Sequence, residues 1–202
     1  MAGSLFIVAA PSGAGKTTLV RALLSRDAAV RLSVSFTTRA PRDGEVNGVA
    51  YNFTSVPDFL ARRDRGEFLE WAEVHGNYYA TSRNWLEEQL AAGHDVLLEI
   101  DCQGAAQVRQ IFPQAVSIFI LPPSFEVLES RLRGRGTDSE EVITRRLVGA
   151  RDEMQQVDQF DYVIINNDLQ VALDELSTVV RAARLRTPLI RVRYPQSFLP
   201  AV

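Results

Sequence analysis

The sequence predicts an α/β fold in which helices flank a parallel β-sheet. Short, continuous apolar runs recur along the chain, and each precedes a stretch with apolar residues at helical spacing. The chain has 202 residues, of which 46% are hydrophobic and 23% charged. A chain of this length buries about 70% of its unfolded surface, and its composition is typical of one soluble globular domain.

The first strand-and-helix unit lies near the amino terminus. Residues 5–10 (LFIVAA) form an apolar run that ends at Pro11, as expected for a strand buried on both faces. From Lys16 onward, Leu19 and Leu23 recur at helical spacing. A strand, a glycine-rich turn and a helix are therefore predicted in that order.

The same order of an apolar strand followed by a helix recurs three times in the second half of the chain. The predicted strands are 94–101, 115–121 and 162–166, and the helices that follow them are 104–111, 124–133 and 168–183. Alternating strands and helices of this kind favour a parallel sheet covered by helices.

Two segments interrupt this alternation of strands and helices. Residues 35–93 contain shorter pieces rich in Thr, Arg, Gly, Asn and aromatic residues, which predicts an inserted subdomain of strands and loops. Residues 133–146 have glycines on both sides of Arg135 and then acids after a helix start at Asp138 or Ser139. This pattern is typical of an arginine-bearing flap.

The counts of rare residues exclude several classes of protein. A single cysteine, Cys102, cannot form an intramolecular disulfide, and with two histidines it cannot supply a Cys-rich zinc site. We expect Cys102 to serve in packing. No apolar run approaches 18 residues and no signal peptide is recognisable, so a cytoplasmic protein without a membrane span is expected.

Charge is distributed unevenly along the chain. The net charge is -3, yet residues 181–202 carry five arginines and no acid. Such a tail could contact nucleic acid, an anionic membrane or the acidic body of a second subunit. Since no basic cluster accompanies it elsewhere, a solvated or packed terminus is favoured over nucleic-acid binding.

A phosphate-binding motif follows the first predicted strand. Residues 10–17 read APSGAGKT and depart from the pattern G-x-x-x-x-G-K-[ST] only at Ala10. This loop turns backbone N–H groups toward phosphate oxygens, while its lysine reaches the outer phosphates and its hydroxyl binds Mg²⁺. The residues predicted to bind nucleotide are Ser12, Gly13, Ala14, Gly15, Lys16, Thr17 and Thr18.

The single lysine supports this interpretation over a glycine-rich turn that binds nothing. Of 22 basic residues only Lys16 is a lysine, and it stands at the position where the motif requires a compact ammonium. The same count excludes a switching GTPase, which needs an N-K-x-D segment. A small domain with two insertions instead favours a kinase that phosphorylates a small molecule.

Six segments together resemble the guanylate kinase family. They are SGAGKTTL (12–19), SVSFTTRAPRDGEVNGVAYNF (33–53), FLEWAEVHGNYYATS (68–82), LLEIDCQGA (97–105), RLRGRGTDSEEVITRRL (131–147) and FDYVIINNDL (160–169). The likeness covers about residues 4–185. It implies a P-loop NTPase core (1–34 and 94–183), a mixed α+β GMP-binding insert (35–93), a helical lid (about 134–150) and a basic tail (184–202).

The resemblance implies phosphorylation of GMP to GDP by ATP, and it assigns the GMP site. The phosphate of GMP would be held by Arg39, Arg42, Tyr51 and Tyr79, and its base by Ser35, Glu70, Thr81 and Asp101. Guanidinium forks and phenolic hydroxyls suit a phosphate dianion. A carboxylate accepts hydrogen bonds from N1–H and N2–H₂ of guanine, whereas adenine presents an acceptor at N1 and is rejected.

The resemblance also implies the roles of the groups around the transferred phosphoryl group. Lys16, Arg135, Arg146 and Arg39 would neutralise charge, with Arg151 a weaker candidate. Mg²⁺ would be held by Thr17, with Glu99 acting through water. Asn166 or Asn167 would lie beside the adenine, and Asn167 is the predicted contact.

Two other functions compete with this one. A catalytically silent relative would bind phosphopeptides as a scaffold, but the intact phosphate loop argues against it. A related kinase would use another acceptor, such as a ribose phosphate, but the two carboxylates argue against that. The expected partners are GMP and ATP, and neither nucleic acid nor a membrane. Self-association through the tail is one alternative that the sequence leaves open, beside a tail that packs on the core.

Overall fold

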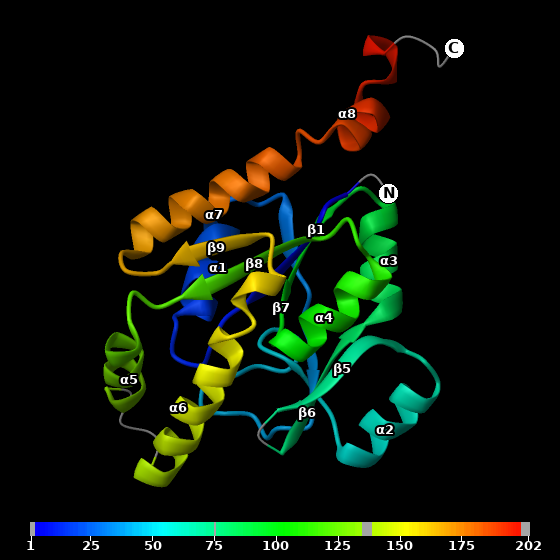
Figure 1. The fold of residues 1–202 in the computed structure, drawn as a ribbon. Coiled ribbons are helices and arrows are strands. Elements are labelled where there is room, and N and C mark those ends of the chain that lie inside the picture. Colours follow the sequence, from blue (N-terminus) through cyan, green and yellow to red (C-terminus); the bar gives the residue numbers. More distant parts are fainter. Residues whose placement is uncertain (1–2, 75, 135–138, 199–202) are drawn as a thin grey trace.

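The computed structural model describes residues 3–74, 76–134 and 139–198. It contains a parallel sheet with helices on both faces, a smaller mixed sheet beside it, a pair of helices at one side and a C-terminal arm (Figure 1). No helix within these ranges is long and apolar enough to cross a membrane.

The main sheet has five parallel strands in the order β2-β7-β1-β8-β9. Their bounds are β1 Leu5–Ala9, β2 Val30–Leu32, β7 Asp95–Glu99, β8 Val116–Leu121 and β9 Tyr162–Ile165. Four of these strands are predicted by the apolar runs. The edge strand β2 is not, because three residues of mixed burial carry too little pattern.

Alternate residues of β1 pack on opposite faces of this sheet. Phe6 and Val8 pack with helices α1 (Lys16–Arg26) and α7 (Leu169–Ala183). Leu5 and Ile7 pack with helices α3 (Arg83–Ala91) and α4 (Cys102–Ile111). This two-sided burial explains why the strand is apolar throughout.

Helix α4 begins two residues earlier than the sequence predicts. Asp101 is its N-cap, and the Asp101 carboxylate accepts a hydrogen bond from Gly104 N at 2.8 Å. Strand β7 ends at Glu99 instead of residue 101. Asp101 therefore stands at a helix start, facing the end of the sheet where ligands bind in α/β folds.

The predicted insert contains a four-stranded sheet in the order β4-β3-β6-β5. Its elements are β3 Phe36–Thr37, β4 Asn52–Phe53, α2 Val56–Asp64, β5 Phe68–Val74 and β6 Asn77–Ser82. Phe59 of α2 packs on Phe68 and Ala80, so the small sheet has its own core. Helix α3 follows β6 and buries Leu86 and Leu90 against the main sheet, which joins the two layers.

Two helices occupy the region of the predicted flap. Helix α5 spans Phe125–Arg133 and helix α6 spans Glu140–Met154, and they pack through Leu128, Leu132 and Ala150. Ser139 caps α6 and accepts a hydrogen bond from Val142 N, as one of the two predicted helix starts requires. A 3₁₀ turn, η1 (Val157–Gln159), leads from α6 to β9.

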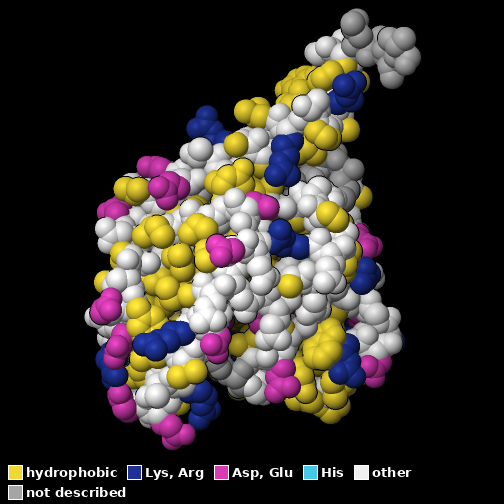
Figure 2. Space-filling model, in the orientation of Figure 1, with side chains coloured by type: hydrophobic (Ala, Val, Ile, Leu, Met, Phe, Trp, Pro, Cys, Tyr) yellow, Lys and Arg dark blue, Asp and Glu magenta, His cyan; other side chains and the backbone are white. Residues whose placement is uncertain are grey.

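The C-terminal arm extends away from the body of the molecule (Figure 1). It consists of α8 (Thr187–Arg193) and the 3₁₀ turn η2 (Pro195–Ser197). In Figure 2, basic and hydrophobic side chains alternate along it. At its root, Arg184 forms ion pairs of 2.6 Å with both Asp27 and Asp95, which anchor the end of α7 to the main sheet.

Candidate active site

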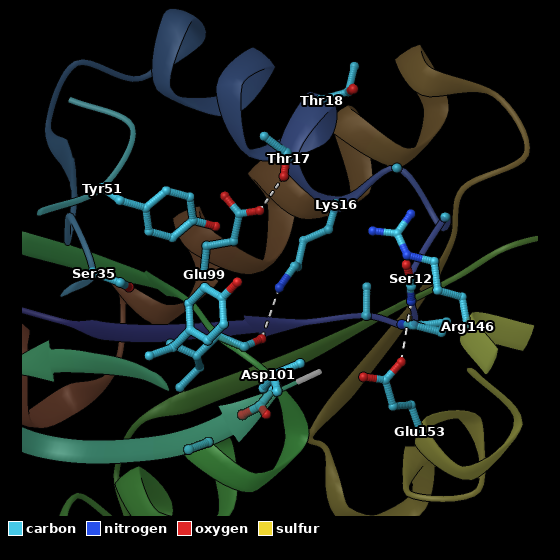
Figure 3. Close-up of a pocket in the computed structure, with 18 of the residues that line it drawn as sticks. Ser12, Lys16, Thr17, Thr18, Ser35, Tyr51, Glu99, Asp101, Arg146 and Glu153 are labelled. Carbon is cyan, nitrogen blue, oxygen red and sulfur yellow. Dashed lines mark hydrogen bonds between the residues drawn. The ribbon is translucent and has the colours of Figure 1, made fainter. Parts of the chain in front are cut away.

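A cavity of about 280 Å³ opens beyond the carboxyl ends of β1 and β7. The phosphate loop, the small sheet and helix α6 all contribute to its walls (Figure 3). Most of the predicted site residues line it: Ser12, Gly13, Gly15, Lys16, Thr17, Thr18, Ser35, Tyr51, Glu70, Tyr79, Glu99, Asp101 and Arg146. Residues from distant parts of the sequence therefore meet in one cavity.

The phosphate loop has the turn that its sequence predicts. Gly13 and Gly15 have φ values of 95° and 89°, and Gly15 is the N-cap of α1. A Cβ at Gly13 would lie 3.0 Å from Leu132, and a Cβ at Gly15 would lie 2.5 Å from Asn166 Nδ2. Both positions therefore exclude a side chain by conformation and by space.

Two residues support the loop from behind, and sequence reasoning gave neither this role. The side chain of Asn166 is buried and donates a hydrogen bond from Nδ2 to Ala14 O at 2.8 Å. Arg131 donates to Asn166 O at 2.9 Å and to Ala14 O at 3.4 Å. The exposed Asn167 donates its backbone N–H to Ile165 O at 2.9 Å, and its predicted adenine contact stays a prediction.

Lys16 and Thr17 face the end of β7. Lys16 Nζ donates to Ile100 O at 2.9 Å, and Thr17 Oγ1 donates to Glu99 Oε1 at 2.5 Å (Figure 3). In the described part of the chain, no cluster of three or more His, Cys, Asp and Glu side chains could hold a metal. Mg²⁺ needs no such cluster, because it takes one or two protein oxygens with phosphates and water. The oxygens of Thr17 and Glu99 fit that demand.

Helix α6 brings one acidic and one basic side chain to the phosphate loop. Arg146 lines the cavity near Ser12, and the Glu153 carboxylate accepts a hydrogen bond from Ser12 N at 3.3 Å (Figure 3). Burial raises the pKa of Glu153, and the Ser12 amide and the Lys16 ammonium oppose the rise. No short motif marks Glu153, because its partner is 141 residues away in the sequence.

The buried acid Glu70 lies on β5, paired in register with Thr81 of β6. Glu70 is 4% exposed. Burial raises the pKa of its carboxyl group to about 7, and the charge of Asp101 adds to the rise. The fully buried Thr81 opposes the rise, although its hydroxyl meets no partner at normal hydrogen-bond geometry. Glu70 and Asp101 thus form a pair of acids at one end of the cavity, as the resemblance implies.

Two tyrosines, Tyr51 and Tyr79, also line the cavity, and arginines lie near them. The Tyr51 and Tyr79 rings meet edge to face at 5.9 Å, and burial raises the pKa of Tyr51, which keeps its hydroxyl a donor. Arg39 Cζ lies 5.3 Å from the centre of the Tyr51 ring. Glu45, which sequence reasoning missed, accepts from Arg39 Nη2 at 2.8 and 3.0 Å and from Arg42 N at 2.8 Å. Neither Arg39 nor Arg42 lines the cavity, but Arg39 contacts Tyr51, which does.

Arg151 and Cys102 are not among the described residues that line the cavity. Arg135 is outside the described residues. The Arg151 guanidinium lies over the Phe125 ring at 4.5 Å, a packing contact between α6 and α5. Cys102 is buried with Ala9 and Phe119, and burial raises the pKa of its thiol to about 12, so its expected packing role is confirmed.

Comparison with known proteins agrees with this geometry. Residues 2–183 match the family model described as guanylate kinase. The chain belongs to the guanylate kinase family. It is 66% identical to a guanylate kinase of Aromatoleum aromaticum over 98% of this chain and 97% of the relative, and 62% identical to one of Dechloromonas aromatica over 98% of each.

The fold of this guanylate kinase family member is similar to that of a solved guanylate kinase structure. The crystal structure of guanylate kinase from Anaplasma phagocytophilum is 35% identical, with a TM-score of 0.77 over 96% of both chains. The predicted family, enzyme class and α/β fold are therefore confirmed.

Proposed function

We propose that this protein transfers the γ-phosphoryl group of ATP to GMP, which forms ADP and GDP. The observation that carries the proposal is one cavity that joins an intact phosphate loop to two acids, the buried Glu70 and the half-buried Asp101. Such a cavity holds a donor phosphate chain and an acceptor base at once. Roles in purine nucleotide metabolism and GMP recycling, in the cytoplasm, belong to the same proposal.

ATP binds with its phosphates on the loop formed by Ser12, Gly13, Ala14, Gly15 and Thr18. The backbone N–H groups at the start of α1 favour anions. Lys16 leaves Ile100 O and turns its ammonium to the β and γ oxygens. We keep Asn167 as the proposed adenine contact.

Thr17 would hold Mg²⁺, and Glu99 would act on it through a water molecule. The hydrogen bond from Thr17 Oγ1 to Glu99 Oε1 supports the proposal because it places two hard oxygen ligands side by side. When bound, Mg²⁺ neutralises charge on the transferred phosphoryl group.

GMP binds with its base on Glu70 and Asp101 and with the hydroxyls of Ser35 and Thr81 nearby. The buried Thr81 hydroxyl lies by Glu70 and meets no partner at normal hydrogen-bond geometry among the described residues, and a ligand would satisfy it. The phosphate of GMP is held by the hydroxyls of Tyr51 and Tyr79 and by Arg39 and Arg42, and Glu45 holds Arg39 in place.

The transfer is an in-line displacement at the γ-phosphorus. An oxygen of the GMP phosphate forms the new P–O bond while the bond to the β–γ bridging oxygen breaks and ADP leaves. The acceptor oxygen is already anionic, so no strong general base is needed. Lys16, Arg39, Arg135 and Arg146 stabilise the spread charge, and closure of the lid (about 134–150) excludes water.

The basic arm supports a further part of the proposal, self-association of the chain. Leu185 is 71% exposed and Val192 59% exposed, beside the arginines of the arm. Exposed apolar side chains mixed with positive charge fit the acidic body of a second copy. Sedimentation of the full chain and of a Leu185→Glu/Val192→Glu variant tests this, and equal sedimentation of the two would contradict it.

Product analysis tests the reaction. The protein is incubated with ATP, GMP and Mg²⁺, and the nucleotides are separated. Equal amounts of ADP and GDP are expected, with none when EDTA removes the metal. ADP without GDP would contradict the acceptor, and tight phosphopeptide binding without turnover would favour the scaffold.

A further inference from the structure

Gly104 lies in the first turn of α4, buried behind the acid pair. It follows Asp101, Cys102 and Gln103, and its backbone is helical, with no positive φ. Its backbone conformation therefore does not require glycine. Glycine inside a helix is less favourable than alanine by about 1 kcal/mol, so another constraint must act here.

That constraint is the closeness of Glu70. A Cβ on Gly104 would lie 2.6 Å from Glu70 Oε2 and 3.1 Å from Glu70 Cδ, and 3.3 Å from Asp101 Oδ1. Ordinary van der Waals contact begins at about 3.4 Å. The space that a single methyl group would fill is therefore occupied by the carboxylate of Glu70.

Both acids lie against Gly104. Asp101 Oδ1 accepts from Gly104 N at 2.8 Å, so the acid at the helix start is tied to the same peptide unit. Glu70 is 4% exposed, and β5 and β6 hold its backbone opposite Thr81.

We propose that Gly104 is a specificity-determining positioning residue whose missing side chain sets where the Glu70 and Asp101 carboxylates meet the base. The proposal rests on the proposed function, in which these acids read guanine. Gly104 itself touches no substrate. It acts through the acids.

The identity of the atom that a Cβ would meet distinguishes this role from a general packing role. The atom that a Cβ would meet is the far end of a side chain, so the protein relieves the clash by moving Glu70. The helix itself gains from alanine. Gly104→Ala should therefore keep the fold stable while it misplaces the acceptor of the guanine N–H groups.

The first test compares Gly104→Ala with Gln103→Ala, an exposed neighbour in the same helical turn. In Gly104→Ala we expect the KM for GMP to rise about 10- to 100-fold, the effect typical of a misplacement near 1 Å, with the KM for ATP unchanged within about twofold. Thermal unfolding should stay at or above the wild-type temperature. Gln103→Ala should match the wild type in all three. An unchanged KM for GMP, or equal rises in both KM values with lost stability, would overturn the proposal.

The second test asks whether the Glu70 contact is the cause. Glu70→Asp shortens the side chain by one methylene and removes the carboxylate from the place that a Cβ would take. Added to Glu70→Asp, Gly104→Ala should therefore raise the KM for GMP far less than it does in the wild type. Equal effects in both backgrounds would contradict the proposed contact.

The outcomes separate the two proposals. A wild-type enzyme that uses GMP selectively, together with an unaltered Gly104→Ala variant, overturns only the inference about Gly104. A wild-type enzyme that ignores GMP overturns the proposed function and this inference with it.

Discussion

The Glu153 carboxylate accepts a hydrogen bond from Ser12 N, 3.3 Å away, on the loop where phosphate is proposed to bind. A negative side chain from α6 thus uses an amide that an anionic ligand would use. The negative charge of Glu153 repels a phosphate chain at this amide.

The first prediction concerns this charge. Glu153→Gln keeps the size of the side chain and removes its negative charge, so the KM for ATP should fall by about an order of magnitude. The KM for GMP should change little. Steady-state kinetics with each substrate varied in turn checks this, and an unchanged or higher KM for ATP would contradict it.

The second prediction concerns Lys16. Lys16→Ala should lower kcat by several orders of magnitude, because the ammonium is proposed to neutralise the transferred phosphoryl group. GMP binding, measured by calorimetry, should persist. Arg21→Ala is the matched control, since it removes an exposed positive charge from the same helix. An active Lys16→Ala enzyme would separate this loop from the chemistry.

The third prediction concerns base selection. Glu70→Gln replaces an acceptor for two guanine N–H groups by an amide that accepts at only one atom. We expect kcat/KM for GMP to fall about 100-fold or more, with a smaller change for AMP. Kinetics with both acceptors gives the ratio, and an unaltered ratio would mean that another group reads the base.

The fourth prediction concerns stability and pH. Burial raises the pKa of Glu70 from 4.5 to about 7, so between these values the folded state keeps a proton that the unfolded state has released. The free energy of unfolding therefore falls as pH rises through this window, by a few kcal/mol at most. Glu70→Gln removes this loss.

Urea unfolding without nucleotide checks the sign. The stability of Glu70→Gln relative to the wild type should be greater at pH 8 than at pH 5. The same difference at both pH values would show that Glu70 has an ordinary pKa in the folded protein.

The fifth prediction concerns the phosphate loop. Gly15→Ala should abolish ATP binding, because φ is 89° and the new Cβ would lie 2.5 Å from Asn166 Nδ2. Gly66→Ala is the control, since Gly66 has a φ of 71° and open space around it. Both variants should lose stability, by about 1 kcal/mol at Gly66, but only Gly15→Ala should lose ATP. Retained ATP binding in Gly15→Ala would contradict the role of this contact.

The sequence predicts the parts of the fold and site that depend on local patterns. The apolar runs give β1, β7, β8 and β9, and the motif at residues 10–17 gives the phosphate loop. The short edge strand β2 and the start of α4 at Asp101 depend on tertiary partners instead. Local patterns carry little information about such partners.

The same reason explains the functional roles that sequence reasoning missed. Glu153, Arg131 and Asn166 act on the loop from more than 100 residues away, and no motif spacing records this. Gly104 lies inside a quoted motif, but only the position of Glu70 shows why it has no side chain.

The measurement that tests the account most directly is ADP release with ATP and Mg²⁺ when GMP, AMP, CMP, UMP or no acceptor is supplied. We predict rapid release with GMP alone, because only guanine offers its N–H groups to Glu70 and Asp101. Equal release with all acceptors, or none with GMP, would contradict the account.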